Sequence, residues 1–332
     1  MSCRGAIYVI LAGMLAVFAA ACGNSGRGRR ASASEDARRT VAFPDTEVPG
    51  MITAPDERVE YLLNHFWDGF FSLPAGVCDS ATVNGVRKDE LEGKFGVFST
   101  LLWSAPPKTA SDAVTALFRK AEAAEIRDTS SNVFDTFTEY ARKYFYDPNS
   151  PVRNEEFYLP YVKGLSVSPA VPDDMKPAYG YEAEMCSLNR IGEKTADFEF
   201  TDLQGKRHRL YDTKADYILL FFSNPGCPNC KEITEMIESS GRTRELEDSG
   251  RLAVVNIYID LEVDKWKEYA SEYPKEWISG YDHKYLIRTD QIYNVRAIPS
   301  LYLLDGEKRV ILKDAPQDKV FEVLDGILAK AE

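Results

Sequence analysis

The segment from Tyr217 to Glu232, YILLFFSNPGCPNCKE, limits the fold more than any other part of the chain. It opens with an apolar run, residues 217–222, which is long enough for a buried strand and too short for a helix. A Ser-Asn-Pro-Gly turn follows, and then Cys227 and Cys230, separated by two residues. The segment therefore predicts a buried strand, a turn and the start of a helix.

The spacing of these two cysteines predicts reversible thiol chemistry. Positions three apart on a helix share a face, so Cys227 and Cys230 are close enough to form and reopen a small disulfide. Free N–H groups and the helix dipole favour the thiolate of Cys227, which is the nucleophilic form. Half of a zinc site and an inert structural disulfide are the alternatives. The sequence has no second Cys-x-x-Cys pair and only three histidines, so we expect no metal.

The composition narrows the class of partner. The chain has 332 residues, enough for two domains, and its 44% hydrophobic and 28% charged content is that of a globular protein. A formal net charge of -12 argues against nucleic acid, since neutralising phosphates needs an excess of basic residues. We expect protein disulfides or small thiols as partners, together with a redox partner protein, and no cofactor.

The first 22 residues resemble a lipoprotein signal peptide. Arg4 precedes an apolar stretch, residues 6–21, that is short for a membrane span, and three alanines stand before Cys22. The resemblance implies that Cys22 becomes the lipidated first residue and anchors the chain to a membrane. A plain secretory signal is the alternative. Residues 23–45 are polar and are predicted to be a flexible tether. In some Gram-negative bacteria, acidic residues just after the lipidated cysteine send a lipoprotein to the cell surface. None follows Cys22 closely, which favours a periplasm-facing anchor in the cell envelope.

Two further cysteines, Cys78 and Cys186, remain in the mature chain. Export places them in an oxidising compartment, where they are able to pair with each other. Two buried free thiols are the other interpretation, and the sequence leaves both open.

Residues 46–188 are predicted to form an all-helical domain. Apolar residues recur at helical spacing after Thr53, which is the expected N-cap of the first helix. Further helices are expected near residues 91–103, 111–126, 133–146, 154–162 and 179–189. The aromatic residues among them are expected to form a core rather than a ligand cage.

Residues 189–332 change to an α/β pattern. A hairpin is expected between residues 196 and 211, and a second buried strand at residues 252–259 follows the cysteine helix. Strand, helix and buried strand in this order indicate a parallel crossover. Pro299 stands at the entry to another apolar strand, where proline is expected only at a first position, an edge or a special turn. A last strand at residues 310–312 and a helix from about residue 318 complete the domain.

Together these motifs resemble the thioredoxin fold. The resemblance covers residues 191–332, and the segment from Gly192 to Gly205 is similar to the opening of the exported TlpA/ResA-like branch. In the helical half, His65–Asp68 and Asp147–Tyr158 resemble a domain of unknown function that precedes thioredoxin-like domains in bacterial lipoproteins. The resemblance therefore spans nearly the whole mature chain.

The resemblance implies a role for each motif residue. Cys227 would be the attacking thiolate, and Cys230 the resolving thiol. Pro299 would be a cis-proline opposite them, which leaves the backbone of Ile298 free to pair with an extended substrate. A peroxiredoxin is excluded, because that family needs Thr or Ser where Asn224 stands.

Two departures from the family pattern concern the site. Gly226 replaces the common Trp before the first cysteine, and Phe221 replaces a buried acid on the preceding strand. Proton transfer to the resolving thiol therefore lacks its usual base. Asp260 and Glu262, just after the second buried strand, are the candidates, and ordinary surface acids are the other interpretation.

These features predict a membrane-tethered thiol-disulfide oxidoreductase whose helical domain selects or orients a partner. A scaffold lipoprotein that uses the thioredoxin fold as a platform is the alternative, since fold does not imply function. The intact cysteine pair and Pro299 favour the enzyme, because a platform needs neither.

Overall fold

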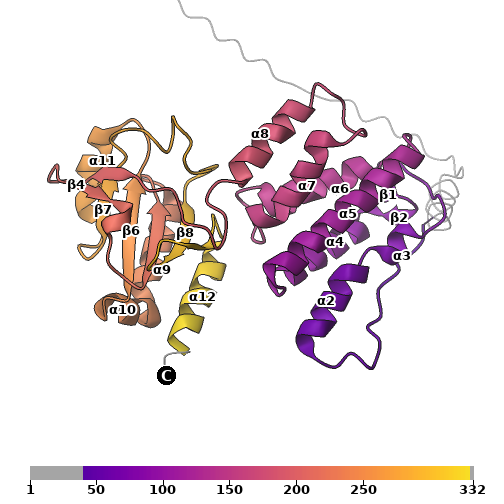
Figure 1. Cartoon of the computed structure of the whole chain (residues 1–332), viewed down its shortest axis with the longest axis horizontal. Helices are drawn as coiled ribbons and strands as arrows, with labels where there is room; N and C mark the ends of the chain where they lie inside the picture. Colours follow the sequence, from indigo (N-terminus) through magenta and orange to yellow (C-terminus); the bar gives the residue numbers. More distant parts are fainter. Residues whose placement is uncertain (1–39, 330–332) are drawn as a thin grey trace, which may run out of the picture. The chain divides into compact units, whose positions relative to one another are not determined.

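The computed structural model describes residues 40–329 (Figure 1). The signal segment, the lipidation candidate Cys22 and most of the predicted tether lie outside the described residues. Within the described range, no helix is both long and apolar enough to cross a membrane. The chain from Val41 onward forms one compact unit.

The N-terminal half is built from helices, as expected, with one small addition. A hairpin of two-residue strands, β1 (Thr82–Val83) and β2 (Val86–Arg87), interrupts the helices. The helices are α2 (Pro55–His65), α3 (Asp68–Phe71), α4 (Lys88–Trp103), α5 (Pro107–Arg127), α6 (Val133–Ala141) with the π-helical turn η1 (Arg142–Tyr146), α7 (Glu155–Val167) and α8 (Lys176–Cys186). The first of them begins at Pro55 after Ala54, without the side-chain cap expected from Thr53.

Aromatic side chains fill the core of this half, as the helical spacing predicted. Trp67 lies against Phe98 and Phe137, with ring centroids 5.4 and 5.0 Å apart. Phe43 belongs to the same core, is 5% exposed and packs on Trp67. The predicted tether, residues 23–45, therefore extends too far, because the chain joins the fold from Val41, which bridges Val86.

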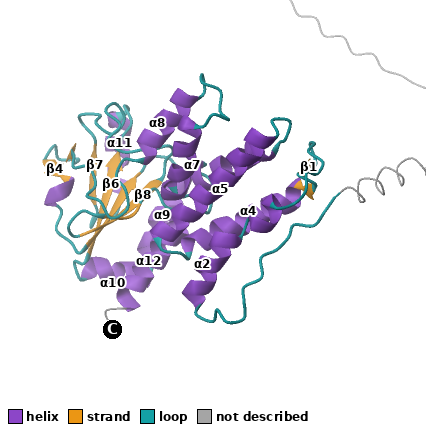
Figure 2. Ribbon diagram, turned by 45° about the vertical axis from the view of Figure 1, so that its right-hand side comes forward, coloured by secondary structure: helices purple, strands orange, loops and turns teal. Residues whose placement is uncertain are grey.

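The C-terminal half contains one seven-stranded mixed sheet in the order β4-β3-β7-β6-β5-β8-β9. Figure 2 shows nearly all of the strands in this half and mostly helices in the other. The central strands β5, β6 and β7 are parallel, and β8 runs antiparallel to β5. The strands are β3 (Glu199–Thr201), β4 (Arg207–Arg209), β5 (Tyr217–Phe222), β6 (Leu252–Tyr258), β7 (Ile278–Tyr281), β8 (Ser300–Asp305) and β9 (Val310–Leu312).

Both faces of the sheet are covered, which explains why β5 reads as a continuous apolar run. Leu219 and Phe221 point to one face, where they join residues of α9 (Pro228–Ser239), α10 (Gly241–Asp248) and α12 (Gln317–Ala329) in one core cluster. Leu220 and Phe222 point to the other face, toward a second cluster. A separate group of aromatics surrounds Trp266 in α11 (Val263–Tyr269).

A buried polar network joins the two halves at Glu155, the first residue of α7. Its carboxylate accepts a hydrogen bond of 2.7 Å from Asn294 Nδ2 and lies 3.0 Å from Nε of Arg296. The other carboxylate oxygen lies 2.7 Å from Nζ of Lys313. Arg296 also contacts Asp314, so two carboxylates face two cations in the interior. Asn294 and Arg296 lie just before Pro299, and the network therefore ties the helical half to that loop.

Cys78 and Cys186 are separate free thiols in the structure. Cys186 is fully buried at the end of α8, and burial raises the pKa of its thiol. The Sγ atom of Cys78 lies 3.9 Å from Oγ of Ser131 in the helical half. The pairing that the sequence left open is therefore not formed here.

Candidate active site

The two cysteines of the Cys-x-x-Cys motif lie at the junction of β5 and α9. After Phe222 the backbone turns through Gly226, whose φ of +71° lies in the left-handed region that favours glycine. Cys227 is the N-cap of α9, and Pro228 occupies its first turn, where a missing N–H costs nothing. The predicted order of strand, turn and helix is confirmed. The same φ explains why glycine, rather than the common Trp, stands before the first cysteine.

The environments of the two sulfurs differ. Cys227 is partly exposed, and its Sγ accepts a hydrogen bond of 3.2 Å from the backbone N–H of Cys230. Such a bond to an N-cap sulfur stabilises negative charge on it. Cys230 is only 4% exposed and packs with Phe221 and Leu301. Burial is the main reason why the pKa of Cys230 is raised, and the hydrogen bond with Cys227 is the second. The pair thus has one accessible sulfur and one protected thiol.

The loop before β8 reaches the same place. The Ile298–Pro299 peptide bond is cis, as the resemblance implied. Ser300, the next residue, is paired with Phe222 in the antiparallel ladder of β5 and β8, which brings the loop to the end of the strand that precedes the cysteines. Ile298 and Cys227 pack against one core cluster. The structure therefore brings Ile298 and both cysteines to one core cluster and places Pro299 beside the residue that pairs with Phe222.

The two candidate proton carriers occupy different positions. Asp260 accepts hydrogen bonds from Nδ2 of Asn224, in the turn before Cys227, and from Arg288. Glu262 is 64% exposed and pairs with Lys265 at 2.6 Å. Within residues 40–329, no hydrogen bond joins either carboxylate to a cysteine. Asp260 contacts the turn through Asn224, whereas Glu262 pairs with Lys265 at the surface.

A buried polar chain beneath the turn was missed in the sequence. Ser223 Oγ donates a hydrogen bond of 2.5 Å to Oδ1 of Asn256 and lies 3.2 Å from the hydroxyl of Tyr273. Burial raises the pKa of Tyr273. The one available signal was Asn256, a single polar residue in the otherwise apolar strand LAVVNIYI. The oxygen of its fully buried amide accepts from Ser223, which is distant in the sequence, whereas its Nδ2 has no hydrogen-bond partner among the described residues.

A cleft of about 300 Å³ lies next to the start of α9; Asn229, which stands between the two cysteines, lines it, whereas Cys227 and Cys230 do not. Asn229 and Ile233 of α9 line one side, and Ile298 and Pro299 line another. In the described part of the chain, His, Cys, Asp and Glu side chains form no group of three or more that would suit a metal ion. The pair of one accessible and one buried thiol suits thiol exchange with a disulfide.

Comparison with known proteins agrees with this geometry. Residues 21–189 match a family described as a domain of unknown function (DUF5106), and residues 215–310 match a thioredoxin-like family. A crystal structure of a thioredoxin-like protein from Bacteroides caccae superposes with a TM-score of 0.74 at 36% identity, over 86% of this chain and 98% of that one.

Two curated relatives resemble the C-terminal half. The thiol-disulfide oxidoreductase ResA of Bacillus cereus is 30% identical over 148 residues, which cover 42% of this chain and 78% of ResA. Nucleoredoxin of Xenopus laevis is 28% identical over 101 residues, or 30% of this chain. The match covers 24% of the length of that protein.

Proposed function

Because the chain belongs to the DUF5106 family and its C-terminal half is a thioredoxin-like domain, we propose that it is an exported, membrane-anchored thiol-disulfide oxidoreductase. It acts through the Cys-Pro-Asn-Cys pair on disulfides of envelope proteins. The observation that carries the proposal is the asymmetry of the pair: a partly exposed Cys227 whose Sγ accepts a helix N–H, and a buried Cys230 directly behind it.

Reduction begins when the Cys227 thiolate attacks one sulfur of a substrate disulfide. A new bond joins Cys227 to that sulfur, and the other substrate sulfur leaves as a thiolate. Cys230 then loses its proton and attacks the Cys227 sulfur, which releases the second substrate thiol and closes the protein disulfide. Two electrons pass from the protein dithiol to the substrate. The reverse sequence oxidises a substrate dithiol, and the partner that resets the pair decides the direction.

Two segments support the position of this chemistry in the cell. The apolar segment before Cys22 supports export, and Cys22 supports a lipid anchor. Replacing residues 1–22 with a cleavable secretory signal peptide tests the anchor: we expect the protein to move from the membrane fraction to the soluble periplasmic fraction. A protein that stays in the membrane fraction after this exchange would contradict the anchor and leave the redox chemistry untouched.

Trapping of the intermediate tests the chemistry itself. In a Cys230→Ala variant, resolution is blocked, so mixed disulfides with Cys227 should accumulate in cells and disappear on reduction. A Cys227→Ala/Cys230→Ala double variant is the matched control and should trap nothing. If the single variant traps no more than the double variant, the scaffold interpretation replaces the enzyme.

A further inference from the structure

One wall of the cleft next to the start of α9 comes from the helical half. The turn between η1 and α7 contributes Pro148, Asn149, Pro151 and Arg153 to the lining. The facing walls belong to the thioredoxin-like half: the start of α9, the loop at Ile298 and the start of α12. The cleft therefore borders both halves of the chain, next to Asn229, which stands between the two cysteines, and next to Pro299.

This wall is firmly held. Arg153 donates hydrogen bonds of 3.1 Å to the carbonyl oxygens of Asp314 and Ala315, in the loop that leads into α12. The indole N–H of Trp103 donates to the carbonyl of Val152 at 3.2 Å, and Ser150 Oγ donates to the carbonyl of Tyr144 at 2.6 Å. Because these four hydrogen bonds tie the turn to several different segments, we expect the wall to keep its position in the cleft.

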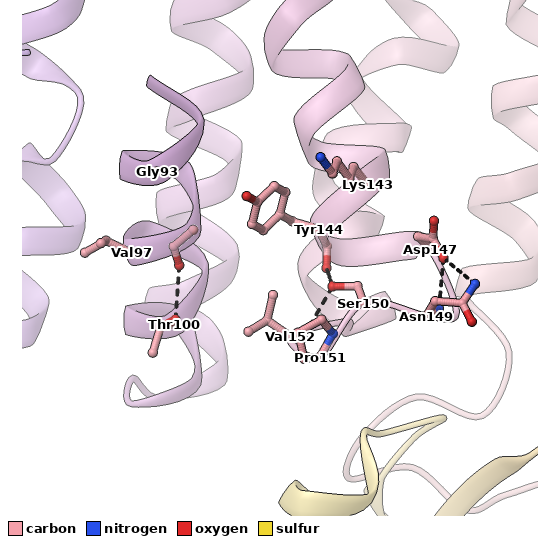
Figure 3. A pocket seen from close by; sticks show the side chains of 11 residues that line it. Gly93, Val97, Thr100, Lys143, Tyr144, Asp147, Asn149, Ser150, Pro151 and Val152 are labelled. Atoms are coloured by element: carbon pink, nitrogen blue, oxygen red, sulfur yellow. Dashed lines mark hydrogen bonds between the residues drawn. The ribbon is translucent and has the colours of Figure 1, made fainter. Parts of the chain in front are cut away.

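The same turn also borders a second, larger hollow of about 660 Å³ (Figure 3). Figure 3 shows α4 on one side of it, with Gly93, Val97 and Thr100, and the turn on the other, with Asn149 and Pro151. Val97 is 52% exposed, and a Cβ atom added at Gly93 would meet nothing within 4 Å. Asn149 and Pro151 line both spaces, so this turn stands between the hollow and the cleft.

We propose that an extended polypeptide segment beside the substrate's disulfide occupies this path, with an apolar side chain in the hollow at α4. The helical half would then favour protein disulfides over small ones. The proposal rests on the proposed function, because it assigns the substrate of that same site.

The chemistry of the path fits this occupant. Ile298, beside the cis peptide bond, is half-buried and lines the cleft, and its backbone suits pairing with such a strand. Apolar Val97 and Pro151 suit a nonpolar side chain, whereas a small disulfide would use none of this surface.

The test compares two substrates of the reduced protein. One is a short peptide whose single cysteine is disulfide-bonded to thionitrobenzoate and flanked by leucines; the other is dithiobis(nitrobenzoate), which lacks a peptide. Release of thionitrobenzoate gives both rate constants. Asn149→Trp places a large side chain at an exposed position between the two spaces. Gly93→Leu extends a side chain from α4 into the hollow, where an added Cβ atom would meet nothing within 4 Å.

The ratio of the peptide rate constant to the small-substrate rate constant is expected to fall about tenfold in Asn149→Trp and severalfold in Gly93→Leu. A tenfold fall corresponds to a loss of about 1.4 kcal/mol of interaction with the peptide. Asn64→Trp, an exposed change on α2 outside both spaces, is the matched control and should leave the ratio unchanged. Unchanged ratios in both variants would overturn the inference alone. A wild-type protein that reduces neither substrate would overturn the proposed function and the inference with it.

Discussion

At the scale of single residues, the main property of the site is the difference in solvent exposure between its two sulfurs. Cys227 is accessible at the helix N-terminus, whereas Cys230 is 4% exposed among apolar neighbours. Burial disfavours a thiolate on Cys230, because the charged form loses its solvation. In the proposed reaction, a mixed disulfide on Cys227 is therefore resolved only when this protected thiol loses its proton.

The raised pKa of Cys230 predicts the pH dependence of resolution. Below the pKa of a thiol, the thiolate fraction rises about tenfold per pH unit, so resolution should accelerate steadily between pH 6 and about 9, beyond the range of an ordinary cysteine at about 8.5. Rapid mixing of a preformed Cys227 mixed disulfide at several pH values measures this rate. A plateau reached below pH 8 would show that Cys230 ionises like an exposed thiol.

The sequence is sufficient to predict that Cys227 and Cys230 lie at the start of a helix, because strand, turn and helix follow one another in one short segment. It also predicts that Pro299 is cis, because its segment matches a family motif. It did not predict Glu155 or the Ser223–Asn256 contact. Glu155 looks like any acid in the first turn of a helix, and its cationic partners lie more than a hundred residues away. Asp260 was singled out by position in the sequence, but only the structure shows that it binds Asn224.

At the scale of elements, strands with strong apolar runs were predicted well and short connecting elements were not. Strand β5 has the predicted bounds, because both of its faces are buried. Strand β7 was missed, since its sequence ISGY has neither an apolar run nor an alternating pattern. Helix α10 was missed because its sequence GRTRELED is mostly polar and buries only Thr243 and Leu246.

Strand β7 depends on a glycine, and this gives a stability prediction. A Cβ atom at Gly280 would lie 2.5 Å from the ring of Phe200 and 2.8 Å from the carbonyl oxygen of Thr201. Gly280→Ala should therefore lower the free energy of unfolding by about 1 to 3 kcal/mol through overpacking. Urea denaturation measures the change.

Gly180→Ala is the matched control for this change. Gly180 lies within α8, where an added Cβ would meet nothing within 4 Å. Because alanine favours a helix over glycine by about 1 kcal/mol, this variant should be as stable as the wild type or more so. Equal effects of the two substitutions would contradict the close approach of β3 and β7.

At the scale of the whole molecule, the two halves depend on each other through Glu155. Its carboxylate is fully buried between Arg296 and Lys313, one from the loop at Pro299 and the other just after β9. The network fixes both the helical wall of the cleft and the loop that faces the cysteines. The helical half therefore contributes to the shape of the redox site as well as to its surroundings.

Glu155→Ala should lower the free energy of unfolding by about 3 to 5 kcal/mol, because it leaves the buried Lys313 without its carboxylate and Arg296 with Asp314 alone. Asp112→Ala is the control: it breaks only the exposed pair with Lys108 and should cost less than about 1 kcal/mol. Urea denaturation of both variants makes the comparison. A loss below 1 kcal/mol in Glu155→Ala would show that the halves are held without this network.

The central claim is that Cys227 and Cys230 form a reversible redox pair. Its most direct test is the reduction potential of this pair, measured by thiol trapping after equilibration with glutathione or dithiothreitol, in a Cys78→Ser/Cys186→Ser background. We predict one two-electron transition between roughly -270 and -120 mV, the range of thioredoxin-fold oxidoreductases. A pair that stays reduced, or stays oxidised, across all buffers would contradict the account.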